Sequence, residues 1–262
     1  MTAGTVRRSP ATRGRSGRIT AAAGGVGKRE VEGVLDVVLI HGSAQSAEGF
    51  VLVNAALHDL GLTGLALDLP QREDLDSKGF VERAVDQVGA AGGADRPVVV
   101  AHSLGGVLAA QIAAELGARH IVWLAAYVPD FRGRTSAASD VDLNRQSIYV
   151  PEFLQLTASP FEEPAVAEEF MFHDCDDAIR SWALTTLRPF QPAGVVQERP
   201  PLRPDIPSTY VLPTADRVFR PEWMARVAYR RLGVSAVDID TGHCPNVSRP
   251  GEIAALIAEA AK

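Results

Sequence analysis

Apolar residues recur along this chain in two alternating patterns. Short runs rich in β-branched residues, bounded by Gly, Pro or Asp, predict buried strands at 34–40, 62–69, 98–101, 120–128, 208–212 and 236–239. Between these runs, apolar residues three or four positions apart predict helices at 46–60, 76–91, 104–116, 221–232 and 251–261. Strands that alternate with helices favour an α/β fold, with a mostly parallel, doubly wound sheet covered on both faces.

The alternation stops at residues 131–205. This segment has no comparable strand, and prolines separate two or three helix-like pieces. We expect it to form a helical cap, inserted after the sixth strand of the fold. The predicted α/β core then consists of residues 31–130 and 206–262.

Residues 1–30 differ from the remainder in composition. Residues 1–28 hold six basic and no acidic residues, so a chain of net charge −6 carries about −12 outside this arm. Its Gly, Ala, Arg, Ser and Thr bury too little apolar surface to offset the entropy of ordering, which predicts a basic, disordered leader. A transit peptide and a start codon placed too early are alternatives for the same residues. The acidic body and the lack of base-stacking aromatic residues in the arm argue against nucleic-acid binding.

The remaining composition is that of an ordinary globular protein, with 46% hydrophobic and 22% charged residues. Apolar runs stay well below the roughly 18 residues that a membrane span needs, so we expect a cytoplasmic protein without a membrane partner. Cys175 and Cys244 lie far apart in the chain and indicate neither a disulfide framework nor a zinc site. A homodimer is left open.

The sequence AHSLGG at 101–106 lies between a predicted strand and an Ala-rich predicted helix. This is the context of a nucleophile elbow, in which a sharp turn flanked by small residues exposes Ser103 at the end of the sheet. Ala101 stands where glycine is usual. The alternative is a turn that merely caps the helix or binds an anion.

A serine hydroxyl needs a histidine to accept its proton, and a carboxylate to orient that histidine. His243 follows the last predicted strand and Asp216 follows strand 208–212, which gives the chain order Ser, Asp, His of this kind of fold. Parallel strands end at the same edge of a sheet, so the three side chains are expected to converge. Asp130 also ends a strand and remains the alternative acid.

Attack by Ser103 on a carbonyl would create an oxyanion, and backbone N–H groups stabilise such a charge. We expect these donors to be the N–H groups of Leu104 and Ser43. The chemistry requires no cofactor. A metal site at His173–Asp177 is not expected, because contiguous residues cannot all converge on one ion.

With these motifs assembled, the chain resembles the α/β-hydrolase superfamily over about residues 34–261. The resemblance is greatest to the branch of plant hydroxynitrile lyases, methyl salicylate esterases and their bacterial relatives. The motifs that carry it are VLIHG at 38–42, AHSLGG at 101–106, YVP at 127–129, FHDC at 172–175, GHCP at 242–245 and VSRP at 247–250.

Departures from the plant branch bear on the substrate. Gln45, Glu48 and Phe50 stand where that branch usually has a histidine and tryptophans. The lyases carry a threonine in place of Gly42 and a lysine in the cap, whereas residues 131–205 contain no lysine. Cleavage of a cyanohydrin is therefore not expected.

The expected function is hydrolysis of a small carboxylic ester or lactone through an acyl-enzyme. The residues predicted to line the substrate pocket are His41, Gln45, Phe153, Phe172 and Trp182. Two alternatives remain: a lyase or elimination reaction of natural-product tailoring that uses the same Ser–His pair, and a small-molecule receptor with slow turnover.

Overall fold

The computed structural model describes residue 1 and residues 34–71 and 74–262. The predicted leader lies outside the described residues, apart from Met1. The chain divides after Glu30, and the described residues beyond that point belong to one folded unit. None of the described helices is long and apolar enough to cross a membrane.

The described residues form one parallel sheet of six strands in the order β2-β1-β3-β4-β5-β6. The strands are β1 Leu35–Ile40, β2 Gly64–Ala66, β3 Ala94–His102, β4 His120–Leu124, β5 Ser208–Pro213 and β6 Val237–Ile239. The chain moves outward from β1 to β2 and then crosses back to β3 on the other side of β1. Ligand crevices of open α/β sheets lie at the carboxyl ends of such strands, where the direction of the strand order changes.

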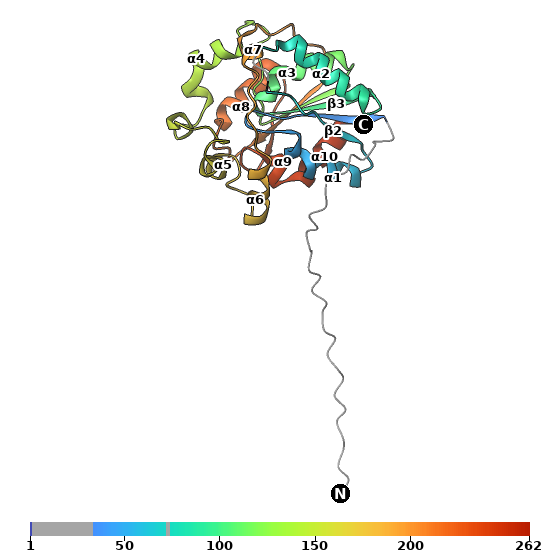
Figure 1. Ribbon diagram of the computed structural model, residues 1–262, viewed down its shortest axis with the longest axis vertical. Helices are drawn as coiled ribbons and strands as arrows, with labels where there is room; N and C mark the ends of the chain where they lie inside the picture. The colour runs from blue at the N-terminus through green and yellow to red at the C-terminus, as the bar shows by residue number, and fades with distance from the viewer. Residues whose placement is uncertain (2–33, 72–73) are drawn as a thin grey trace. The chain divides into compact units, whose positions relative to one another are not determined.

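Helices cover both faces of this sheet (Figure 1). The α-helices are α1 Val51–Asp59, α2 Ser77–Ala90, α3 Gly106–Glu115, α4 Ala137–Ile148, α5 Pro164–Phe170, α6 Asp177–Thr185, α7 Ala193–Gln197, α8 Pro221–Val227, α9 Pro245–Ser248 and α10 Pro250–Ala260. Figure 1 shows α2 and α3 on one side of the strands and α1 and α10 on the other. The predicted α/β-hydrolase fold class is confirmed by this arrangement.

The alternation of side chains along the strands produces two separate cores. In β1, Val38 and Ile40 belong to the cluster under α2 and α3, whereas Val37 and Leu39 belong to the cluster under α1 and α10. A strand buried on both faces reads as a continuous apolar run, which is why the run before His41 predicted it. Each such side chain contributes about 1.5–3 kcal/mol when it is fully buried.

Several predicted boundaries differ from the structure. The strand predicted at 62–69 is only β2, because the backbone N–H groups of Asp68 and Leu69 donate to the side chains of Gln87 and His41 rather than to a strand. The strand predicted at 120–128 ends at Leu124, since Ala125 has a φ of +45° and the backbone leaves the sheet.

Two predicted helices also change along their length. The helix predicted at 104–116 begins with a 3₁₀ turn at Ser103–Gly105 and becomes α3. The helix predicted at 221–232 is α8 followed by a π-helical turn at Ala228–Leu232. Gly233 ends this turn in the left-handed conformation, at a φ of +76°.

Residues 131–205 contain α4, α5, α6, α7 and a 3₁₀ turn at Phe153–Gln155, which is more helix than the two or three pieces expected. They contain no sheet strand among the described residues. The segment leaves the sheet after β4, the fourth strand of the described chain. We expected the cap after the sixth strand of the fold, whereas four strands of the described chain precede this segment.

Candidate active site

The carboxyl ends of four strands bring the predicted catalytic residues together. His41 and Gly42 follow β1, and Ser103 follows β3 at the point where the strand order reverses. Asp216 and His243 follow β5 and β6. Residues more than a hundred positions apart therefore meet at one edge of the sheet.

Ser103 occupies a sharp turn between β3 and α3. Its φ is +50°, a left-handed conformation that costs a non-glycine residue roughly 1–3 kcal/mol. A side chain at Gly105 would place its Cβ 2.5 Å from the carbonyl oxygen of His41, so only glycine fits there. The carbonyl of Ser103 accepts the N–H of Tyr127 at 2.9 Å. These contacts hold the turn in the form expected of a nucleophile elbow.

Ser103, His243 and Asp216 form a continuous hydrogen-bonded chain. His243 Nε2 lies 3.0 Å from Ser103 Oγ, and its Nδ1 lies 2.8 Å from Asp216 Oδ2. All three residues are buried, with 8%, 2% and 5% of their surface exposed. A histidine placed in this way can take a proton from the hydroxyl while the carboxylate fixes its tautomer.

The second carboxylate oxygen of Asp216 fixes the acid in its own turn. Asp216 Oδ1 accepts the backbone N–H groups of Val218 at 2.7 Å and Phe219 at 3.0 Å. Asp130, the alternative acid, instead accepts the N–H of Gly133 within its own turn. The structure therefore places Asp216, and not Asp130, against the histidine.

The loop after β1 approaches the serine closely. A Cβ on Gly42 would lie 2.6 Å from Ser103 Cβ, so this position has no room for a side chain. Within residues 34–71 and 74–262, no hydrogen bond occupies the N–H of the next residue, Ser43. Leu104 is the second residue of the 3₁₀ turn, where helical N–H groups lack an intrahelical acceptor. Both predicted oxyanion donors thus lie in segments next to the hydroxyl.

Comparison with known proteins decides the family. The sequence model of the alpha/beta hydrolase family matches residues 37–256, most of the chain. The chain belongs to the alpha/beta hydrolase family. It is also 29% identical, over 252 residues, to a probable hydrolase, R7, of Phoma sp. (strain ATCC 20986 / MF5453), an alignment that covers 86% of this chain and 97% of that protein.

Solved structures of this family share the fold. A polyneuridine aldehyde esterase superposes with a TM-score of 0.71 at 19% identity, over 88% of this chain and 100% of the esterase. A methylesterase from Arabidopsis superposes with a TM-score of 0.66 at 15% identity, over 87% of this chain and 98% of its own. These likenesses agree with the resemblance found in the sequence motifs.

In this hydrolase, His102 and Gln45 connect the three loops of the site. His102 Nε2 lies 2.9 Å from the carbonyl oxygen of His243, and its Nδ1 lies 2.8 Å from Oε1 of Gln45. Gln45 also accepts the N–H of Gly42 at 3.2 Å and donates to Cys244 Sγ at 3.3 Å. Gln45 is therefore a buried link between the loops of the site.

The protonation state of His102 follows from this burial. Burial, and then the nearby His243, lower the pKa of His102 to about 3, so its ring is neutral near pH 7. The one N–H of the neutral ring can be donated to only one of its two acceptors, the His243 carbonyl oxygen and Gln45 Oε1. No spacing signal in the sequence indicates this contact, because its partners are far apart in the chain.

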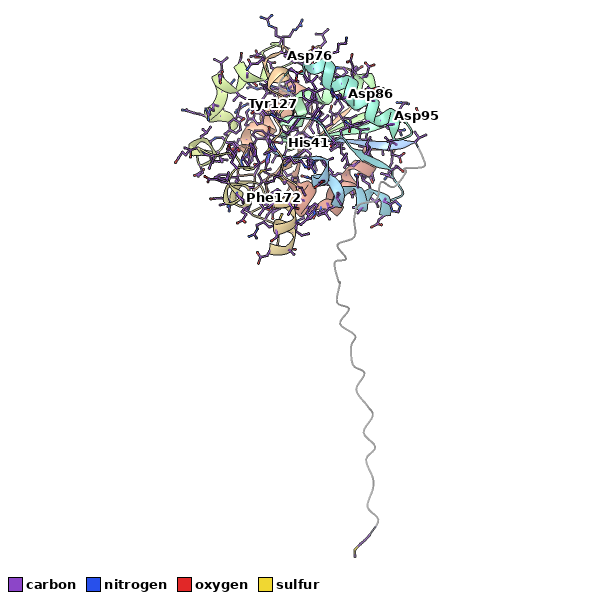
Figure 2. All side chains as sticks on the ribbon, viewed as in Figure 1. His41, Asp76, Asp86, Asp95, Tyr127 and Phe172 are labelled. Atoms are coloured by element: carbon purple, nitrogen blue, oxygen red, sulfur yellow. The ribbon has the colours of Figure 1, made fainter. Side chains whose placement is uncertain are left out.

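His41, also predicted to line the pocket, lies directly after β1 and next to Gly42. The side chain is buried in the interior (Figure 2), where Nε2 accepts the N–H of Leu69 and Nδ1 lies 3.1 Å from the Gly42 carbonyl. Its ring packs edge-on against Phe190, with centroids 4.5 Å apart. Burial lowers the pKa of His41 to about 4. His41 therefore holds the loop after β1 as a neutral side chain.

The three predicted pocket residues of the cap lie in two places. Phe172 lies in the interior (Figure 2), 1% exposed, in a cluster with Cys175 and Cys244. The half-buried Trp182 packs against the same cluster. Phe153 is half-buried and stacks on Tyr149 at 5.5 Å.

Aromatic rings extend from Phe153 to the catalytic histidine. Tyr149 contacts Phe219 with ring centroids 5.5 Å apart, and Phe219 meets the His243 ring edge-on at 5.4 Å. Phe153 also contacts Phe170 at 5.5 Å. Beside these rings lies a hollow of about 340 Å³, lined by Val150, Glu152, Glu169, Phe170, Asp216 and Arg217. Of the three predicted pocket residues in 131–205, Phe153 is thus connected to His243 through the rings of Tyr149 and Phe219.

Proposed function

We propose that this alpha/beta hydrolase is a serine hydrolase that cleaves a small carboxylic ester or lactone through an acyl-enzyme. The observation that supports this most strongly is the continuous chain from Ser103 Oγ through His243 to Asp216. Its burial strengthens each electrostatic interaction and excludes competing water.

In the proposed mechanism Ser103 Oγ attacks the substrate carbonyl while His243 Nε2 accepts the hydroxyl proton. Asp216 holds Nδ1–H and stabilises the imidazolium that forms. The N–H groups of Ser43 and Leu104 stabilise the oxyanion, each by about 3–4 kcal/mol. His243 then donates the proton to the departing alcohol, and water releases the acid from Ser103 by the same steps in reverse order.

An ester or lactone is proposed on two grounds. Two of the structural neighbours are named as a polyneuridine aldehyde esterase and a methylesterase. The rings of Phe219, Tyr149, Phe153 and Phe170 beside His243 suit an apolar acyl or alkyl group. Cyanohydrin cleavage is excluded from the proposal because the cap has no lysine and Gly42 has no room for a side chain.

The test uses a panel of p-nitrophenyl esters and lactones together with a fluorophosphonate probe, on the parent protein and on Ser103→Ala. The parent is expected to turn over at least one ester and to be labelled at Ser103. Ser103→Ala should lose both properties. Equal rates for the two proteins would contradict the proposed nucleophile.

Other results would identify the alternatives. Turnover of a substrate without any acyl-enzyme would indicate an elimination reaction that uses the same Ser–His pair. No turnover, combined with a small molecule that raises Tm, would indicate a receptor. The proposal also includes a cytoplasmic location and leaves a homodimer open.

A further inference from the structure

The FHDC motif at 172–175 lies between α5 and α6 and has no part in the proposed mechanism. Its two outer residues, Phe172 and Cys175, are buried with Cys244 and Val247, which follow His243 in the chain. Arg180 donates to the carbonyl of Cys175 at 2.7 Å. The motif is therefore a fixed turn of the cap that packs on the loop carrying the catalytic histidine.

Asp174, inside this turn, binds that loop directly. Its Oδ2 accepts the backbone N–H of Gly242 at 2.9 Å and the hydroxyl of Thr241 at 2.7 Å. The Thr241 hydroxyl in turn lies 2.7 Å from Ser248 Oγ. Asp174 thus holds the two residues that immediately precede His243.

His173 reaches the turn that carries the acid. Its Nε2 lies 3.1 Å from the carbonyl oxygen of Ala215, the residue before Asp216. The acid turn and the histidine loop are also joined to each other, since the N–H of Ala215 donates to the carbonyl of Thr241 at 3.1 Å. Two neighbouring cap residues therefore close a three-way junction with the segments that carry Asp216 and His243.

The charge state of Asp174 fits this role. Burial acts to raise its pKa, but the hydrogen bonds from Gly242, Thr241 and Ser248 outweigh burial and lower the pKa overall. An ionised carboxylate makes stronger hydrogen bonds than a neutral acceptor. The fit is also tight, because a Cβ on Gly242 would lie 2.7 Å from His173 Nε2 and 2.8 Å from Asp174 Oδ1.

From these contacts we infer that Asp174, with His173, is a positioning residue for the triad, through which the cap sets the location of His243 relative to Ser103. The inference rests on the proposed function. It predicts that loss of the Asp174 carboxylate slows chemistry at Ser103, since a displacement of about 1 Å can cost roughly 100-fold in rate.

The chain offers a matched control in the same turn. Asp176 is also an acid with a backbone hydrogen bond, but it accepts the N–H of Ile179 at the start of α6 and contributes to stability as a helix cap. Asp176→Ala should therefore lower Tm and leave the reaction unchanged.

The experiment compares Asp174→Ala, Asp174→Asn and Asp176→Ala in the full chain, with the rate of fluorophosphonate labelling, kcat, KM and Tm as readouts. Asp174→Ala should label about 10- to 100-fold more slowly, with the loss in kcat rather than in KM. Asp174→Asn keeps an oxygen acceptor and should recover most of the rate. Parental labelling by Asp174→Ala, with a Tm like that of Asp176→Ala, would overturn the inference.

Two further variants keep the result interpretable. If Asp174→Ala does not fold, His173→Ala tests the contact with Ala215, and it should label more slowly than the parent. A parental rate for that variant would also count against the inference. Ser103→Ala separates the two proposals, because labelling that survives in it contradicts the proposed nucleophile whatever the Asp174 variants do.

Discussion

Ser103 and Gly42 approach each other closely at the centre of the site. Ser103 has a φ of +50°, and the Gly42 backbone lies so close to it that a methyl group would meet Ser103 Cβ at 2.6 Å. A turn of this kind exposes a hydroxyl and brings backbone donors next to it. The geometry at this point therefore depends on the absence of one methyl group.

Gly42→Ala should reduce kcat/KM by about 100-fold or more, because the loop with the Ser43 N–H must move away from the oxyanion. The measurement is kcat/KM on the best ester of the panel. Gly49→Ala is the control, since a Cβ there meets its nearest atom at 3.9 Å, an ordinary contact. Equal losses in the two variants would show that the effect is not specific to the site.

Asp216→Asn should lower kcat by about 10⁴-fold, because an amide can hold His243 in the wrong tautomer. The hydrogen bonds to Val218 and Phe219 can survive in this variant, so its Tm should change little. Asp130→Asn, the change in the alternative acid, should keep parental kcat. A larger loss in Asp130→Asn than in Asp216→Asn would reverse the assignment.

Sequence reasoning at the residue scale worked where a residue follows a strand. Ser103, Asp216 and His243 each follow a strand of a parallel sheet, which is sufficient to predict that they meet. It did not predict the contacts of His41 and Gln45, whose polar atoms are taken by Leu69, Gly42 and Cys244. Those partners depend on the packing of distant loops, for which the local pattern holds no signal.

At the scale of elements, the predicted strands were most accurate in the centre of the sheet. β1 and β3 are buried on both faces and read as continuous apolar runs. β2 was predicted too long because Leu69 is as buried as a strand residue but donates its N–H to the His41 side chain rather than to a strand. In the centre of the sheet, buried residues also pair with a neighbouring strand. At its edge, a residue such as Leu69 is buried without being part of a strand.

His102 joins two of these elements, since it ends β3 and its ring lies between the carbonyl of His243, beyond β6, and Gln45 Oε1. His102→Ala leaves a buried oxygen without its hydrogen-bond partner, at a cost of about 1–3 kcal/mol. We expect a lower Tm and about tenfold slower labelling of Ser103, because about 1.4 kcal/mol corresponds to a factor of ten in rate. His102→Gln can restore a donor and should recover part of both.

The control for this prediction is His120→Ala. His120 contacts the Thr209 hydroxyl at 2.9 Å, between β4 and β5, and it is only partly buried. This variant should keep the parental labelling rate. If His102→Ala also labels like the parent, His102 does not position His243.

At the scale of the whole molecule, two buried neutral histidines link folding to pH. The pKa of His41 is about 4 and that of His102 about 3 in the folded chain, both lowered mainly by burial, against about 6.5 when unfolded. Below pH 6.5 the unfolded chain therefore binds more protons than the folded chain. Stability is fully present above pH 6.5 and falls as the pH drops toward 4.

Each of these imidazoles should contribute on the order of 3 kcal/mol to this loss. The measurement is urea unfolding at pH 7, 6, 5 and 4.5, with the slope m as a check that the transition itself is unchanged. The urea midpoint should fall steadily over this range. A midpoint that is constant from pH 7 to pH 4.5 would contradict the neutral, buried state of both side chains.

The domain division is less well determined by sequence than the sheet. The break in strand–helix alternation indicated the point at which the chain leaves the sheet, after β4. It did not predict that the FHDC turn packs on the histidine loop, because contacts of Asp174 with Thr241 and Gly242 cross 67 and 68 positions. The division into core and cap remains a prediction.

The central claim is that Ser103 forms an ester with the acyl group of the substrate, and intact-protein mass measurement tests it most directly. The protein is mixed with the best p-nitrophenyl ester and quenched in acid within the first turnover. A mass increase equal to the acyl group, located on the peptide with Ser103 and absent in Ser103→Ala, is the predicted result. Release of p-nitrophenol with no acylated protein at any quench time would contradict it.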